Sequence, residues 1–290
     1  MPEENVNKKI SELDEVIEID GTHFIPVSSE VLGTGRASSE LFAEFIENKQ
    51  HDSFIKCEVG KIENKSIYSI ITMKKARIRA DLVPVSTTDL IDGQKLQTSM
   101  TVQDFALRNK PMLVCNINPT DNVIYNGILY GNDWASSAGS RTGMYGTTAD
   151  GNIVCQRYGS FSNMLSLGAV SAIGSWQPLI LDDAIIPIAD YSTFNTPNPW
   201  QILGEDDENF YLFSSYCRFG EYVGMTLQEA QEFCINRNWQ NAYAFDGGGS
   251  VQVFGGKPYT NHSTLYDANR SYRKQYMVLV FSERDENDGN

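Results

Sequence analysis

The feature that most constrains this chain is a glycine-rich turn between two predicted strands. The run Ala244–Ser250 reads Ala-Phe-Asp-Gly-Gly-Gly-Ser. Residues 241–245 predict a buried strand, and the alternating apolar residues of 251–254 predict a second one. Glycine lets the backbone take positive φ and leaves space above the turn for a ligand. Asp246, at a strand end before such a turn, stands where loops often carry chemistry.

A well-marked helix precedes the first of these strands. Thr226 and Glu229 have the spacing of a capping box, in which each side chain bonds a free backbone N–H of the other residue. Apolar residues then recur at the helical period. We therefore predict a helix from Thr226 to about Arg237, with Glu229 as a capping residue rather than an acid catalyst.

The helix and the turn together resemble the signature of the phosphodiester glycosidases. That family has a Gly-x-Thr-Leu-x-Glu-x-Ala helix start, then a strand, then Asp-Gly-Gly-Gly-Ser. Here the two parts are Gly224–Ala230 and Asp246–Ser250. The resemblance implies an α+β domain of mixed or antiparallel sheets with a few helices. It covers about residues 53–282.

Other segments of the chain fit the same arrangement. Strand-like runs occupy residues 66–86, and a strand follows Arg273 at residues 277–281. A second capped helix is predicted to begin at Thr101. Residues 112–116 predict a short buried strand, and Asp150-Gly151 predicts the turn of a hairpin. Residues 125–132 resemble a family hairpin, and residues 168–181 resemble the small-residue region that leads into a family strand.

The chain departs from the family pattern at two places. The family turn Asn-Gly-Gly-Phe-Phe keeps only its first residue, Asn116, and the family Arg of Pro-Arg-Thr-Ala-Ile-Gly is replaced by Trp200. The loss of one positioned charged donor typically lowers a rate by about 10²-fold or more. Arg141 and Arg270 are spare cations that could replace the lost Arg.

The resemblance and the residue chemistry give a set of candidate site residues. Asp246 is the first choice for an acid, base or nucleophile, and Arg273 for the cation that faces it. Two rival readings stay open: Asp246 caps the glycine turn, and Arg273 is an ordinary ion-pair partner. The expected substrate-binding residues, through amide N–H groups or polar side chains, are Asn116, Asn126, Gly127, Gly247, Gly248, Gly249 and Ser250.

Residues 1–50 predict a separate small module. Asp20-Gly21 is a turn signal between two short strand-like runs, and residues 38–46 predict a brief amphipathic helix. The order of these short segments resembles the N-terminal attachment module of bacteriophage tail and tail-fibre proteins. The alternative is an ordinary N-terminal β-extension. Residues 283–290 form a polar, acidic tail.

Composition excludes several classes of partner. The net charge of −14 argues against binding nucleic acid. No apolar run of the length needed to span a membrane is present, and residues 1–20 lack the pattern of a secretory leader. The 5 cysteines show no Cys-x-x-Cys pair and are expected as small core residues. We expect no metal site and no cofactor.

Three functions remain on this basis. The first is a virion protein, assembled in the cytoplasm of a host bacterium, whose first 50 residues bind other tail proteins and whose domain cleaves host surface carbohydrate. The second keeps that location as a structural or glycan-binding protein with degenerate catalysis, and it is slightly favoured by the two departures. The third is a free cytoplasmic phosphodiester glycosidase. The resemblance to tail appendages also implies a homo-oligomer.

Overall fold

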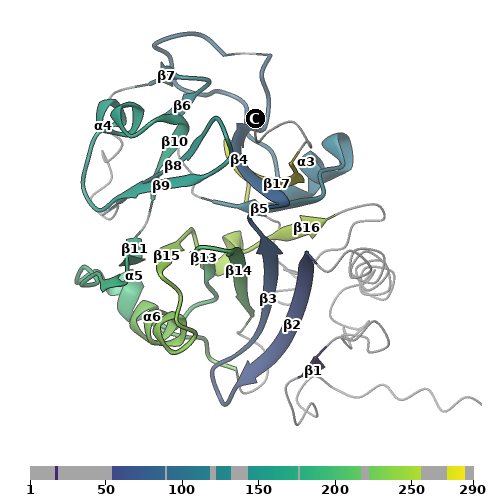
Figure 1. Cartoon of the computed structure of the whole chain (residues 1–290), viewed down its shortest axis with the longest axis vertical. Coiled ribbons are helices and arrows are strands. Elements are labelled where there is room, and N and C mark those ends of the chain that lie inside the picture. Colours follow the sequence, from purple (N-terminus) through teal and green to yellow (C-terminus); the bar gives the residue numbers. More distant parts are fainter. Residues whose placement is uncertain are drawn as a thin grey trace, which may run out of the picture.

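The computed structural model describes residues 17–18, 54–88, 90–117, 122–131, 143–175, 177–216, 222–255 and 273–284. Within them the strands form three sheets, and the paired strands are antiparallel (Figure 1). The expectation of antiparallel sheets with a few short helices is therefore confirmed.

The largest sheet has eight strands and carries the strand that leads into the glycine turn. Its spatial order is β1 (Ile17–Glu18), β2 (Ile55–Ile62), β3 (Ser66–Lys74), β14 (Asn209–Tyr216), β13 (Gln201–Glu205), β15 (Asn241–Ala244), β11 (Gln177–Leu181) and β12 (Ala184–Ile185). The central strands are buried on both faces, which explains their near-continuous apolar sequence.

Two smaller sheets lie against the eight-stranded sheet. The five-stranded sheet runs β7 (Ile128–Tyr130), β6 (Val123–Tyr125), β10 (Ala169–Ser175), β8 (Gly143–Thr148) and β9 (Ile153–Gln156). The four-stranded sheet runs β16 (Val253–Gly255), β5 (Leu113–Asn116), β17 (Met277–Glu283) and β4 (Ile78–Pro84). The strands predicted around residues 66–86, 112–116, 241–245 and 277–281 are all present.

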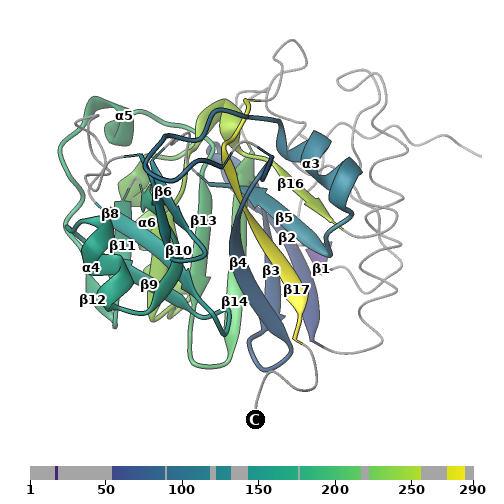
Figure 2. The ribbon, with the colours of Figure 1, turned by 90° about the horizontal axis from the view of Figure 1, so that it is seen from above.

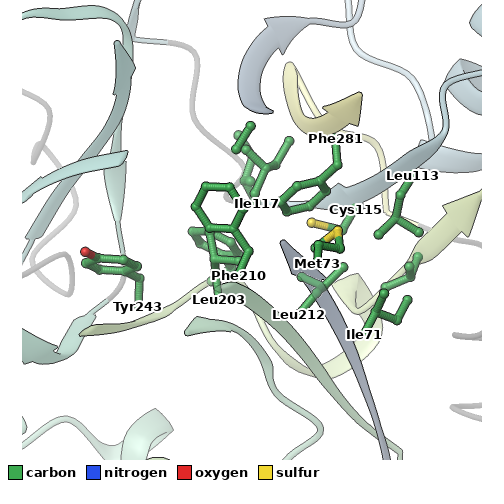
Figure 3. Close-up of a cluster of buried hydrophobic side chains, with 14 of the residues drawn as sticks. Ile71, Met73, Leu113, Cys115, Ile117, Leu203, Phe210, Leu212, Tyr243 and Phe281 are labelled. Carbon is green, nitrogen blue, oxygen red and sulfur yellow. The ribbon is translucent and has the colours of Figure 1, made fainter. Parts of the chain in front are cut away.

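The main core lies where the three sheets meet (Figure 3). Ile71 and Phe210 from the eight-stranded sheet pack in one cluster with Cys115 and Phe281 from the four-stranded sheet. Tyr145 of the five-stranded sheet joins the same cluster. Because side chains alternate across a strand, the neighbours of Ile71 on β3 and of Phe210 on β14 point to the opposite face of the eight-stranded sheet.

Helices cover the outer faces of the sheets. On the eight-stranded sheet, α6 (Leu227–Asn236) packs with α5 (Ser192–Asn195) through Leu227, Ala230 and Phe194. Figure 2 shows α3 (Val102–Asn109) beside β16 and β5, and α4 (Phe161–Ser166) beside β8 and β9. None of the helices among the described residues is long and apolar enough to cross a membrane.

Both predicted helix starts are confirmed. Thr101 caps α3 by accepting a hydrogen bond from the Asp104 N–H at 3.0 Å. Thr226 caps α6, and Glu229 completes the capping box by accepting from the Thr226 N–H at 2.8 Å. Glu229 also pairs with Lys65 at 2.9 Å, so its carboxylate has a structural role.

Several predictions fall outside the described residues. Of the predicted module 1–50, only Ile17 and Glu18 are described, and they pair with Val59 and Glu58 of β2. Arg141, Arg270 and the tail beyond residue 284 also lie outside. The cysteine prediction is confirmed for Cys57, Cys115 and Cys234, which are buried thiols, whereas Cys155 on β9 is only partly buried. Burial raises the pKa of Cys57 to about 12.

A surface ion pair predicts a pH dependence of stability. The Arg237 guanidinium donates to Glu58 at 2.8 Å and to the Tyr68 hydroxyl at 2.9 Å, and the hydrogen bond from Arg237 lowers the pKa of Glu58. A carboxyl whose pKa is lowered by folding stabilises the fold above its unfolded pKa of about 4.3. That stabilisation disappears as the pH falls through the folded pKa.

We therefore expect Arg237→Met to reduce the free energy of unfolding by about 1 kcal/mol at pH 7, since the pair is about one third exposed and screened by solvent. The difference from the wild type should shrink as the pH falls below about 4. Urea unfolding at pH 7, 5 and 3 measures it. A difference that is constant over this range would contradict the assignment to Glu58.

Candidate active site

The glycine turn lies at the junction of the eight-stranded and four-stranded sheets. The Phe245 N–H donates to the Gln201 carbonyl at 2.8 Å, which continues the pairing of β15 with β13. The next N–H, that of Asp246, donates instead to the carbonyl of Ile117, the residue that follows β5, also at 2.8 Å. The chain thus passes from one sheet to the other at Asp246.

Gly247 and Gly248 are required in the turn for different reasons. Gly248 has φ +60°, which favours glycine, and its N–H donates to the Pro199 carbonyl at 2.9 Å. Gly247 has an ordinary φ of −93°, but a Cβ there would lie 2.5 Å from the Pro199 oxygen and 2.9 Å from Trp200 Cε3. The turn is therefore pressed closely onto the segment before β13.

Gly247→Ala tests this close approach. Because the nearest atom belongs to the backbone, the turn itself must move, and we expect the free energy of unfolding to fall by about 1–3 kcal/mol. Denaturant unfolding measures the loss. A variant as stable as the wild type would show that the turn is not held against Pro199 in solution.

Asp246 and Arg273 converge on one cluster, as the resemblance implied. Arg273 Nη1 lies 3.6 Å from Asp246 Oδ2 and 3.4 Å from Ser250 Oγ. Ser250 in turn donates a hydrogen bond to Asp246 Oδ2. The Asp246 side chain is only 5% exposed, whereas that of Arg273 is 55% exposed. The cation is thus the solvent-facing member of the pair, and Asp246 is held behind it.

The catalytic and the capping interpretations of Asp246 are therefore both compatible with its contacts. Its bond with Ser250, four residues on, does cap the turn. Its ion pair also places a fixed carboxylate beside an accessible guanidinium, which is an arrangement that glycoside cleavage can use. The catalytic role of Asp246 and Arg273 stays a prediction.

Asn116 is fully buried beneath the turn. Its Nδ2 donates to the Asp246 carbonyl at 2.8 Å, and its Oδ1 accepts from the Gln252 N–H at 2.9 Å. The side chain therefore braces the backbone on both sides of the glycines. Its predicted part in orienting sugar hydroxyls stays a prediction.

The structure does not bring Asn126 and Gly127 into this cluster. Both are exposed at the turn of the β6–β7 hairpin, with positive φ values of 51° and 74°. The hairpin belongs to the five-stranded sheet and lies well away from β15 in Figure 1. Their predicted substrate contact is likewise untested.

Trp200 occupies the place of the family Arg and is buried as a core residue. Its ring N–H donates to the Met225 carbonyl at 2.8 Å, and its backbone N–H donates to Ser215 Oγ at 2.7 Å. The indole fills the space below Gly247. Position 200 therefore supplies packing rather than a charge.

Sequence reasoning missed Gln252. It is fully buried two residues after Ser250, and its Nε2 donates to the Arg273 carbonyl at 3.1 Å. The available signal was a large polar residue in an otherwise apolar strand pattern. Among the described residues, no group of three or more His, Cys, Asp or Glu is placed to hold a metal ion.

Comparisons with known proteins agree with this fold and motif. The family model for phosphodiester glycosidase matches residues 97–279, which is more than half of the sequence. The chain therefore belongs to the phosphodiester glycosidase family. A search of curated protein sequences gives no significant match.

Two solved structures show the same fold at low sequence identity. One is the catalytic domain of zebrafish N-acetylglucosamine-1-phosphodiester alpha-N-acetylglucosaminidase, auto-inhibited by its pro-peptide. It matches with a TM-score of 0.58 and 18% identity, over 79% of this chain and 83% of that chain. The other is a hypothetical protein from Synechocystis, with a TM-score of 0.55 and 10% identity, over 80% of this chain and 62% of that chain.

Proposed function

We propose that this domain recognises glycans at the Asp246–Ser250–Arg273 cluster and that the cluster has the groups needed to cleave a glycosidic bond. The observation that carries the proposal is the ion pair of a buried carboxylate with an exposed guanidinium, 3.6 Å apart, at the glycine turn. Family membership supports the same chemistry.

Each residue of the cluster has a distinct part in the proposed reaction. The exposed Arg273 guanidinium binds an anionic or polar leaving group by charge-assisted hydrogen bonds. Asp246 acts on the sugar side as acid, base or nucleophile. Hydrolysis of a sugar 1-phosphodiester breaks the bond from the anomeric carbon to the phosphate oxygen, water adds to the sugar, and a phosphate monoester leaves as a stable anion. Its binding by Arg273 therefore matters more than its protonation. Gly247, Gly248 and Gly249 are partly exposed beside the cluster, but the Gly248 N–H donates to the Pro199 carbonyl, so the amides of Gly247 and Gly249 are the ones proposed to bind an anion.

We further propose that the protein is a structural component of a bacteriophage virion, at the tail or tail fibre, and acts on host surface carbohydrate. The resemblance of residues 1–50 to tail attachment modules supports this location. In this setting catalysis is weak or degenerate, because Trp200 replaces a family cation. The second candidate is a free cytoplasmic phosphodiester glycosidase, and the family match supports the glycosidase part of it.

One experiment on the full chain separates these candidates. The purified protein is incubated with chromogenic N-acetylglucosamine and glucose 1-phosphodiesters, and its binding to a panel of bacterial surface glycans is measured in parallel. Turnover supports the glycosidase, and binding without turnover supports the glycan-binding form. A folded protein that shows neither refutes the proposed function.

The location is tested on virus particles. We expect antibodies against the chain to detect it in purified particles and a chain lacking residues 1–50 to be absent from them. Recovery of the chain only in the soluble cytoplasmic fraction of infected cells would favour the free enzyme.

A further inference from the structure

We propose that Gln252 is the positioning residue that holds Arg273 against Asp246 and Ser250. The inference rests on the proposed function of the cluster, and it adds a residue to which the family signature gives no role. Gln252 does not itself belong to the carboxylate–guanidinium pair. It acts on the backbone from which the Arg273 side chain extends.

The contacts of Gln252 join the segments that carry the site. Its backbone N–H and carbonyl form a reciprocal pair of hydrogen bonds with Asn116, at 2.9 Å to Oδ1 and 3.1 Å from the Asn116 N–H. Its side-chain Nε2 donates to the carbonyls of Arg273 at 3.1 Å and Ser250 at 3.4 Å. One buried side chain therefore ties the segment before β17 to the end of the glycine turn.

The geometry of Arg273 makes this tie important. Its guanidinium lies 3.4 Å from Ser250 Oγ and 3.6 Å from Asp246 Oδ2, and more than half of its side chain is exposed. A long, exposed side chain loses considerable rotamer freedom when it is held in one geometry. When the Arg273 backbone is fixed, the guanidinium has fewer accessible positions, so less conformational entropy is lost when it pairs with Asp246.

The choice of glutamine at this position points to positioning rather than to stability. Gln252 is fully buried, yet its Oε1 accepts no hydrogen bond within the described part of the chain. A buried acceptor without a partner is destabilising. An apolar side chain of similar volume would avoid that cost but would lose the bond to the Arg273 carbonyl. The glutamine therefore supplies an N–H donor for the Arg273 carbonyl.

The test compares Gln252→Met with Gln231→Met. Methionine keeps the length of the side chain and removes the donor. Gln231 is a matched control, because it is also buried and its Nε2 donates to two carbonyls, of Leu179 at 2.7 Å and Ile186 at 2.8 Å. It lies on α6, outside the site. If Gln252→Met does not fold, Gln252→Leu, which also removes the donor and buries no charge, replaces it.

Two readouts are taken on each variant. The first is kcat and KM on any substrate that the wild type turns over. The second is the NMR spectrum of the Arg273 guanidinium, assigned by its loss in Arg273→Lys, in which slow rotation about the Nε–Cζ bond reports a restrained group. The second readout requires no activity, so the inference is tested even if the proposed function fails.

We expect Gln252→Met to lower kcat by about 10- to 100-fold, because a small misplacement of a binding group can cost that much. We also expect it to bring the Arg273 guanidinium to fast rotation, the result expected for Asp246→Asn, which removes the charge that pairs with Arg273. Gln231→Met should change neither quantity. An Arg273 signal in Gln252→Met that is as restrained as in the wild type would overturn the inference. So would a wild-type signal that is already unrestrained.

Discussion

Asp246→Asn is expected to reduce the turnover of a sugar 1-phosphodiester by at least about 10²-fold, the lower end of what a positioned acid–base group contributes. The amide has the shape of the carboxylate and keeps an oxygen for the Ser250 hydroxyl, which donates to Asp246 in the native cluster. It has no charge to pair with Arg273 and no basicity. The measurement is kcat/KM on the chromogenic substrate for both proteins.

Asp81→Asn is the matched control for this change. Asp81 also pairs with an arginine, since Arg79 Nε lies 2.8 Å from its Oδ2, but the pair lies on β4, outside the proposed site. We expect this variant to keep wild-type turnover. If Asp246→Asn keeps it as well, while folded, the carboxylate is only a cap for the glycine turn.

Local chemistry made the framework around the turn predictable from the sequence. The Thr226 and Glu229 side chains satisfy neighbouring backbone groups, so the start of α6 is encoded within four residues. The β8–β9 hairpin follows in the same way from Asp150-Gly151, where Gly151 has φ +74°. Asp246 was identified because a glycine turn after a strand is a local pattern too.

The contacts that complete the site are not local, and this explains why they were harder to predict. Arg273 lies 27 residues after Asp246, and only the sheet register of β17 against β5, and of β5 against β16, brings the two segments together. The family resemblance implied that Asp246 and Arg273 lie together. The spacing of apolar residues along the sequence does not predict it. Gln252 appeared to be one more strand residue, because its role depends on the Arg273 backbone reaching it.

Trp200 shows a further limit of motif reasoning. The sequence identified the substitution of the family Arg and predicted a lost cation. It did not reveal that the indole would pack beneath Gly247 and donate to Met225. A large ring at that place constrains the turn from below, so one substitution alters both the charge and the support of the site.

Lys75→Met is expected to lower the free energy of unfolding by about 3 kcal/mol, because it leaves a buried carboxylate without its cation. Lys75 Nζ lies 2.8 Å from Glu205 Oε2, and the Glu205 side chain is 7% exposed. The remaining partner, the Tyr243 hydroxyl, donates to Glu205 at 2.7 Å. Burial and the Glu205 charge hold the pKa of Tyr243 well above its usual range, so the phenol stays a donor at neutral pH.

Two further variants show whether the loss comes from the unpaired charge. Adding Glu205→Gln to Lys75→Met should restore most of the stability, since the amide still accepts from Tyr243 and no buried charge is left. Lys65→Met removes the cation of the exposed Lys65–Glu229 pair and should cost less than about 1 kcal/mol. Urea unfolding measures the stability of the two single variants and the double variant, and the comparison is valid if the m-value is unchanged. A double variant no more stable than Lys75→Met would mean that the ammonium acts mainly through its other contacts, since Nζ lies 5.2 Å from the centre of the Phe210 ring and donates to the Asp206 carbonyl.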